Sequence, residues 1–192
     1  MALKLVTPPA TEPVTLVEAK VHLRVDAVSE DALITSLITA AREYAETVTW
    51  RALITQTWKF YCDDWPVGDE ILLPNAPLQS VASVKYKDTA GIQTTWGVSN
   101  YIVDTDSEPG RVVLGYGLSW PSVTLYPANP IEIEFTAGYG VAAAVPASIK
   151  QAMLLLIGHL YENREATAAG QTITEVPFAV KALLSPLRVW RW

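Results

Sequence analysis

Residues 41–62 read AREYAETVTWRALITQTWKFYC, and the spacing of the apolar residues changes within this stretch. Before Trp50 they recur every three or four positions, which is the spacing of one face of an amphipathic helix. After Arg51 the sequence alternates and is rich in threonine and aromatic residues, which favour strands. A helix is therefore predicted to give way to a strand near Trp50, which indicates a chain of the α+β class.

The chain before this stretch is predicted to begin with an extended segment and a short helix. Residues 1–14 contain three prolines, and the fixed backbone angle of proline favours extended structure. Residues 15–25 read TLVEAKVHLRV, with Thr15 and Glu18 at the spacing of a capping box. In a capping box each side chain satisfies a free amide at the start of a helix. We therefore expect a first helix to begin after Thr15.

A longer second helix is predicted over residues 29–48. Ser29 is expected to cap it, and Glu30 and Asp31 fall in the first turn, where the helix dipole favours acidic side chains. One face of this helix is apolar and is expected to enter a core; it consists of Leu33, Ile34, Leu37, Ile38, Ala41, Ala45 and Val48.

Short strands are predicted across residues 51–140. Turn signals rich in proline, glycine, asparagine and aspartate separate them. In residues 131–135 apolar side chains alternate with Glu132 and Glu134, as expected for a sheet with one buried and one solvated face. An antiparallel β-module inserted between the second and third helices is expected, with strands in the segments ALITQTWKFYCDDW, EILLP, SVASVKY, YIVD, RVVLGY and IEIEFTAGYG.

A third helix is predicted from Pro146, which suits a first helical turn, through residues 147–166. Met153–Ile157 are consecutive apolar residues, so this helix must be covered on several faces. Two interpretations stay open: a central helix inside one core, or a helix that also contacts a neighbouring subunit. A loop over residues 167–175 and a short last helix over residues 178–184 are expected to follow.

The composition is that of a folded protein and disfavours several functions. Half of the 192 residues are hydrophobic and 18% are charged. The net charge of −6 disfavours a protein that grips nucleic acid over its whole surface. Cys62 is the single cysteine and is expected to be a small apolar residue in a strand. No signal peptide is recognised, and the longest apolar run, Ala152–Gly158, is too short to span a membrane.

No constellation of residues points to catalysis, a cofactor or a bound metal. His22 and His159 lie on different predicted helices, and the motifs HExxH, CxxC and GxSxG are absent from the sequence. Residues 104–110, DTDSEPG, place acidic side chains at alternate positions, as in a calcium loop. The glycine comes one position late, however, and Gly115 takes the position of the bidentate glutamate. A solvated hairpin turn is expected there, and binding is favoured over catalysis.

The chain ends on LRVWRW, residues 187–192, which combines apolar and basic side chains. A free terminus is usually polar. Tryptophan and arginine are the residue types that most often anchor interfaces. Either this tail folds back onto its own helices or another protein covers it, and the second interpretation is favoured.

Eight segments carry a resemblance to a known family: HLRVD, LITAAREYAE, RALITQTW, PLQSVASVKY, DSEPGRVV, IEFTAGYG, VPASIKQAMLLLIGHLYENREA and PFAVKALLSPLRVWR. In this order they resemble the head–tail connector proteins of tailed bacteriophages and prophages, the adaptor family that joins the portal ring to the tail. The resemblance extends from Val17 to Arg191. Family members often have glycine where this chain has Trp50, so we expect the second helix to end without the left-handed cap that glycine allows.

The resemblance implies a fold and a role. The fold is a small helical bundle with the β-module inserted into it: a single connector domain over residues 1–192, with N-terminal helices at 1–50, the β-module at 51–140, C-terminal helices at 146–186 and a docking tail at 187–192. The role is structural. Such adaptors are assembled in the host cytoplasm and form a ring in the virion neck, commonly twelvefold, beneath the portal. DNA passes through the lumen without specific binding, and neck or tail-completion proteins attach on the far side.

The expected contact residues follow from this role. The portal is expected to bind the tail, formed by Leu187, Arg188, Val189, Trp190, Arg191 and Trp192. The neighbouring subunit in a homo-oligomeric ring, expected to be a dodecamer, is predicted to contact the third helix at Met153, Leu154, Leu155, Ile157 and Tyr161. Three alternatives stay open: another neck or tail-completion protein, an enzyme of DNA packaging or cell-wall attack, and a DNA-binding protein. The last two are disfavoured by the missing catalytic constellation and by the acidic charge.

Overall fold

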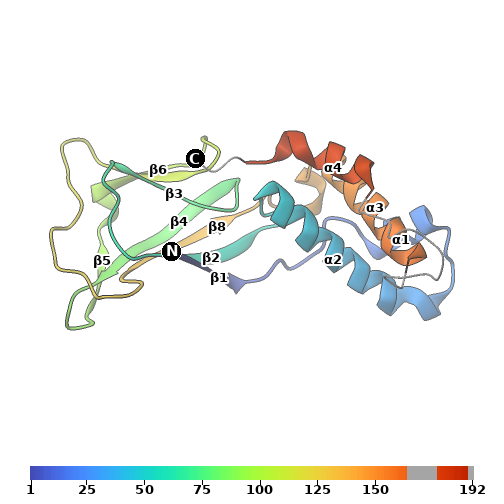
Figure 1. The fold of residues 1–192 in the computed structure, drawn as a ribbon, viewed down its shortest axis with the longest axis horizontal. Coiled ribbons are helices and arrows are strands. Elements are labelled where there is room, and N and C mark those ends of the chain that lie inside the picture. Colours follow the sequence, from blue (N-terminus) through green and yellow to red (C-terminus); the bar gives the residue numbers. More distant parts are fainter. Residues whose placement is uncertain (164–176, 190–192) are drawn as a thin grey trace. The chain divides into compact units, whose positions relative to one another are not determined.

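A computed structural model describes residues 1–163 and 177–189 (Figure 1). The described chain divides into two compact units. The β-unit consists of Met1–Pro9 and Thr55–Gly138, and the helical unit consists of Ala10–Ile54 and Tyr139–Val189. The predicted α+β class is confirmed, with antiparallel sheets between the second and third helices.

The helical unit is built on the helix α3, which contacts both α2 and α4. Its core is formed by apolar side chains of all four α-helices, and Ile34, Met153 and Leu184 have no exposed surface. The predicted last helix has the observed bounds. The elements are α1 (Leu16–Leu23), the 3₁₀ turn η1 (Val28–Glu30), α2 (Asp31–Thr49), η3 (Ala142–Ala144), α3 (Ala147–Glu162), α4 (Phe178–Leu184) and η4 (Ser185–Leu187).

The start of α1 has the capping box predicted from its sequence. The Thr15 hydroxyl accepts a hydrogen bond from the Glu18 amide at 3.2 Å, and the Glu18 carboxylate accepts one from the Thr15 amide at 2.7 Å. The bond from the Thr15 amide is the main reason why the pKa of Glu18 is lowered. The two bonds satisfy amides that the helix itself leaves without partners.

The two ends of α2 differ from the prediction. Ser29 does not cap this helix, because residues 28–30 form the 3₁₀ turn η1 and α2 begins at Asp31. At the other end Trp50 adopts the left-handed conformation, with φ 57° and ψ 38°, although glycine is the residue that suits this conformation best. The expectation that Trp50 would end the helix differently is therefore wrong. The following amide, of Arg51, donates to the Glu46 carbonyl at 3.3 Å and closes the last turn.

The β-unit contains two antiparallel sheets. The five-stranded sheet has the order β1 (Ala2–Thr7), β2 (Gln56–Cys62), β8 (Ile131–Ala137), β4 (Leu78–Lys87) and β5 (Gln93–Trp96). The three-stranded sheet has the order β3 (Glu70–Leu72), β7 (Arg111–Leu114) and β6 (Tyr101–Asp104). The strands predicted within residues 51–140 are present, and β5 was not predicted because its sequence, QTTW, has little hydrophobic alternation.

The N-terminal segment is extended as predicted, and part of it is also paired in a sheet, which was not predicted. Residues 2–7 are β1, which pairs with β2 at one end of the five-stranded sheet. Pro8 and Pro9 come directly after this strand, so neither residue interrupts the backbone hydrogen bonds of β1. The proline-rich composition of the segment therefore concealed a strand that precedes all three of its prolines.

The central strand β8 has the buried apolar face predicted for it, but its other face is not solvated as expected, since Glu132 is only 9% exposed. Ile131, Ile133 and Phe135 are fully buried. Glu132 and Glu134 lie on the opposite face, where Lys59 forms ion pairs with both at 3.1 and 3.5 Å. This second face is therefore covered by paired charged side chains.

Aromatic side chains pack together in the β-unit, where Trp96 and Tyr101 are buried and Trp65 and Trp120 are half-buried. The rings of Trp65 and Trp120 stack with centroids 5.0 Å apart, and Trp96 stacks on Tyr101 at 5.4 Å. Such pairs add about 0.5–1.5 kcal/mol each beyond the area they bury. Cys62 is buried in β2 as predicted, and burial raises the pKa of its thiol to about 11.

Candidate interaction surfaces

Within residues 1–163 and 177–189, no group of three or more His, Cys, Asp or Glu side chains could hold a metal ion. Across those same residues no helix is both long and apolar enough to cross a membrane. The two histidines lie on α1 and α3, as His22 and His159.

The acidic segment at residues 104–110 is the predicted hairpin turn, and it joins β6 to β7. The Asp104 carboxylate accepts hydrogen bonds from the Ser107 hydroxyl at 2.7 Å and from Arg111 Nε at 2.8 Å. These bonds, that of Ser107 first, hold the pKa of Asp104 well below its usual range. Asp104 thus stabilises the turn through neighbours in its own hairpin.

The described part of the C-terminal tail is bound to its own helical unit. The Leu187 carbonyl accepts a hydrogen bond from Arg51 Nε at 2.6 Å. The Val189 amide donates to the Thr49 carbonyl at 2.9 Å, and Val189 is only 7% exposed. Arg188 between them is exposed. Of the six residues predicted to bind the portal, Leu187, Arg188 and Val189 therefore make hydrogen bonds within their own unit, and Trp190, Arg191 and Trp192 lie outside the described residues.

A buried ion-pair network lies along α2, close to this attachment. Arg42 binds the Glu12 carboxylate at 2.8 Å and the Glu46 carboxylate at 2.7 Å. Burial disfavours the charge of Arg42, yet the carboxylates of Glu46 and Glu12 raise its pKa. The other oxygen of Glu46 accepts a hydrogen bond from the Leu53 amide at 2.9 Å. The network joins the segment before α1 to the segment that follows α2.

The five residues of α3 predicted to contact a neighbouring subunit fall into two groups. Met153 and Ile157 have no exposed surface and belong to the core of the helical unit, so they are not available to a second subunit in this fold. Leu154, Leu155 and Tyr161 are half-buried at the border of the same core. Only this second group keeps apolar surface that another molecule could cover. Its contact with a neighbouring subunit stays a prediction.

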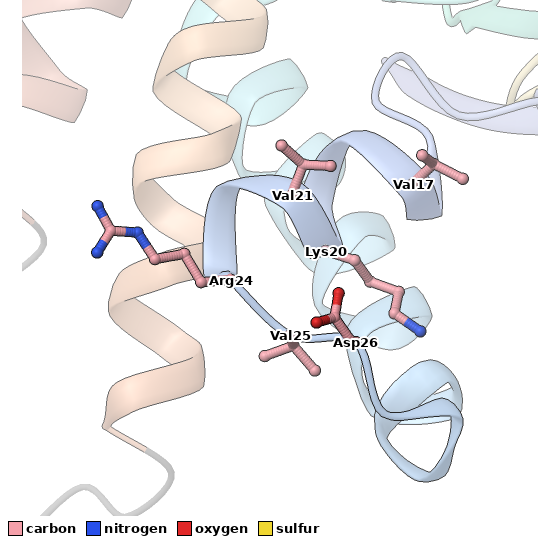
Figure 2. A pocket seen from close by; sticks show the side chains of 6 residues that line it. All are labelled: Val17, Lys20, Val21, Arg24, Val25 and Asp26. Carbon is pink, nitrogen blue, oxygen red and sulfur yellow. The ribbon is translucent and has the colours of Figure 1, made fainter.

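A further apolar surface lies on α1, where Val17 and Val21 are more than two-thirds exposed. Figure 2 shows their side chains on one side of the helix, while Lys20 and Arg24 point in opposite directions. The hollow beside them has a volume of about 410 Å³ and is lined by Val17, Lys20, Val21, Arg24, Val25 and Asp26. Lys20 is already engaged, because its ammonium group binds Asp31 at 2.6 Å. Exposed valines beside a mixed rim are typical of a protein contact surface.

The β-unit carries a second exposed surface on the loops that flank β5, β6 and β7, which we name the neutral loops. Residues 89–103 and 112–131 contain no charged side chain, in a chain with 18% charged residues. Their exposed apolar side chains include Val98 and Tyr116, and Tyr116 is fully exposed. Hydrogen bonds hold these loops in place, from the Gly115 amide to the Asn100 carbonyl at 2.9 Å and from Trp120 Nε1 to the Gly68 carbonyl at 2.8 Å. A partner would therefore meet an ordered surface.

Comparison with known proteins identifies the kind of chain that carries these surfaces. The model of a protein family described as "Head completion protein" matches residues 14–184, which is most of the chain. The chain belongs to the head completion protein family. The resemblance to head–tail connector proteins is thereby confirmed. Among curated proteins no match was found.

Solved structures similar to this family member come from particles called gene transfer agents. A chain in the neck of an empty particle, computed with C6 symmetry, is 31% identical with a TM-score of 0.83. A chain from the virion of the native particle is 30% identical with a TM-score of 0.82. A chain in the native neck, computed with C12 symmetry, is 30% identical with a TM-score of 0.81. Each match covers 100% of this chain and 97% of the other.

Sequence reasoning missed two features of these surfaces. Arg51 and Arg42 are both 7% exposed, but nothing near them in the sequence identifies their distant partners, Leu187 for Arg51 and Glu12 for Arg42. The neutral loops could have been recognised, because the absence of charge over residues 89–103 and 112–131 is visible in the sequence itself. The exposure of Tyr116 could not have been predicted from the sequence, since aromatic residues are common both in cores and in interfaces.

Proposed function

We propose that this chain is a structural protein of the neck of a tailed, phage-like particle, where it forms a ring that joins the portal to the tail-side proteins. The observation that carries the proposal is the full-length match to neck chains, which covers 100% of this chain at 30–31% identity. A match of this extent includes both units and not only a common helical core. Two of those necks were computed with cyclic symmetry, which supports a homo-oligomeric ring.

The ring needs two different contact surfaces on each subunit, because neighbours in a cyclic assembly meet head to tail. The half-buried side chains of α3, Leu154, Leu155 and Tyr161, supply one apolar candidate. The exposed valines of α1, Val17 and Val21, supply another. Both lie on the helical unit, which makes that unit the favoured site of subunit contact.

The portal contact is assigned to the C-terminal segment, residues 187–192. Its sequence combines two tryptophans with two arginines, the residue types that most often dominate binding energy. Leu187 and Val189 tie the start of the segment to its own unit. Arg188, which is exposed, and residues 190–192 are the residues proposed to bind the portal directly.

The channel and the tail-side surface follow from charge. A net charge of −6 suits a ring through which DNA passes without specific binding, because phosphates are repelled by acidic surfaces. The neutral loops suit protein attachment, since the centres of protein interfaces are depleted in charged residues. Tail-side proteins are therefore proposed to bind the β-unit there.

Co-purification with the cognate portal tests this function. The full chain is compared with a chain that ends at Val189, which keeps the two contacts to Arg51 and Thr49. We expect the full chain to bind the portal as a ring and the shortened chain to lose binding. Equal binding by both would refute the C-terminal contact but leave the ring intact. Absence of binding by either chain would favour the alternative of a tail-completion protein placed elsewhere in the neck.

A further inference from the structure

Arg51 is a charged residue in an unusual place, directly after the left-handed Trp50 that ends α2. It is only 7% exposed. Removing a guanidinium group from water is unfavourable unless its donors find partners. The contacts of this side chain therefore indicate what its burial achieves.

Arg51 reaches a part of the chain 136 positions away. Its Nε donates to the Leu187 carbonyl at 2.6 Å. The guanidinium also lies over the ring of Tyr139, with its carbon 5.8 Å from the ring centre, within the range of a cation–π contact. The side chain is thus held on one side by Tyr139 while it holds the C-terminal segment on the other.

A second bond to the same segment comes from the end of α2. The Thr49 carbonyl accepts a hydrogen bond from the Val189 amide at 2.9 Å. Thr49 is the last residue of α2, and the last four carbonyls of a helix have no partner within the helix. The end of α2 therefore accepts a hydrogen bond from the C-terminal segment, through the Thr49 carbonyl, while Arg51 donates one to it. Residues 187–189 are held at two points, one on each side of Arg188.

We propose that Arg51 is a positioning residue for portal binding: by holding residues 187–189 against the end of α2, it fixes the point from which the last three residues begin. This inference rests on the proposed function, in which the C-terminal segment binds the portal. A segment that starts from a fixed point loses less conformational entropy on binding, so it binds more tightly.

Arg42 provides a matched control for Arg51. It is also 7% exposed and lies on α2, the helix that Arg51 follows, so its loss is also expected to destabilise the helical unit. Its ion pairs are made with Glu12, Glu43 and Glu46, and none of these belongs to the C-terminal segment. A variant at Arg42 therefore separates loss of stability from loss of positioning.

The test compares Arg51→Gln and Arg42→Gln in the full chain. Portal affinity is measured at a temperature at which both variants are folded, and the exchange of the Val189 amide is measured by hydrogen–deuterium exchange. We expect Arg51→Gln to weaken portal binding by roughly tenfold, the size of one lost ordering contact, and to speed exchange at Val189. Arg42→Gln is expected to keep portal affinity within about twofold of the unmodified chain.

A second variant keeps the inference testable if Arg51→Gln does not fold. Val189→Pro removes the amide that donates to Thr49 and leaves Arg51 in place. Arg188 already has φ −68° and ψ 126°, which suits a residue that precedes proline. This variant is expected to weaken portal binding to a similar degree as Arg51→Gln.

The outcomes distinguish this inference from the proposed function. If the chain that ends at Val189 fails to bind the portal while Arg51→Gln and Val189→Pro bind normally, the C-terminal contact stands and the positioning role is wrong. If Arg42→Gln weakens binding as much as Arg51→Gln, the effect is one of stability and the inference is wrong. If the chain that ends at Val189 binds normally, the C-terminal contact fails and the positioning role fails with it.

Discussion

Replacement of Arg42 by glutamine is expected to destabilise the helical unit strongly. Arg42 binds two carboxylates at 2.7 and 2.8 Å, and only 9% of its side chain is exposed. Without the guanidinium, the carboxylates of Glu12 and Glu46 would remain close together with no cation between them. Breaking a buried ion pair in this way costs about 3–5 kcal/mol when the pair is fully enclosed.

The exposure of the partners lowers this value. The side chains of Glu12 and Glu46 are 27% and 15% exposed, so water can solvate them in part after the change. We therefore expect Arg42→Gln to lower the free energy of unfolding by about 2–3 kcal/mol, which is below the value for a fully enclosed pair. For a protein of this size the melting temperature would fall by roughly 4–12 °C.

A triple variant tests the reasoning independently of the magnitude. Arg42→Met combined with Glu12→Gln and Glu46→Gln removes the charges of all three groups and leaves the oxygen that accepts the Leu53 amide. Because no uncompensated carboxylate remains, we expect this variant to be more stable than Arg42→Gln alone. Thermal unfolding followed by circular dichroism measures both changes. A triple variant that melts below the single variant would refute the account of the network.

Three further predictions concern separate parts of the chain. Asp104→Asn is expected to lower the melting temperature at pH 7. Since the native pKa of Asp104 is lowered, the difference in melting temperature from the unmodified chain is complete above the ordinary pKa of 3.8 and shrinks as the pH falls below it. An unchanged difference at pH 2 would contradict the stabilising role of the Asp104 carboxylate. Val21→Asp is expected to change the free energy of unfolding by no more than about 0.5 kcal/mol, because the Val21 side chain is 74% exposed. It is expected to prevent ring formation, which is measured by size-exclusion chromatography with light scattering. Rings of normal mass would exclude α1 from the subunit contact. Tyr116→Ser, at a fully exposed position, is expected to preserve stability and ring formation while weakening attachment of tail-side proteins in pull-down assays, and normal attachment would exclude Tyr116 from that contact.

Local signals in the sequence predicted most of the secondary structure, because their partners lie close along the chain. Thr15 and Glu18 are three residues apart and form the capping box as expected. The alternation in residues 131–135 predicted which face of β8 is buried. Such features depend on neighbouring residues, so a single sequence contains the information needed to predict them.

Features that depend on distant residues were predicted poorly. Trp50 takes a left-handed conformation that costs about 1–2 kcal/mol for a residue other than glycine, and contacts around the end of α2 must offset this. Ser29 has a side chain that can cap a helix, but it lies inside the 3₁₀ turn η1, and Glu30 occupies the N-cap position of α2. Met153 and Ile157 resemble Leu154 and Leu155 in the sequence, and only the packing of α3 separates core residues from border residues. The Arg51–Leu187 bond joins residues 136 positions apart, and no local pattern indicates it.

The position of the chain in an assembled particle tests the central claim most directly. Electron cryomicroscopy of particles that carry a tagged copy of this chain would locate the tag and give the symmetry of the density around it. The account predicts a cyclic ring in the neck, between the portal and the tail-side proteins. Tagged density in the capsid shell or along the tail tube, or a chain absent from the finished particle, would contradict it.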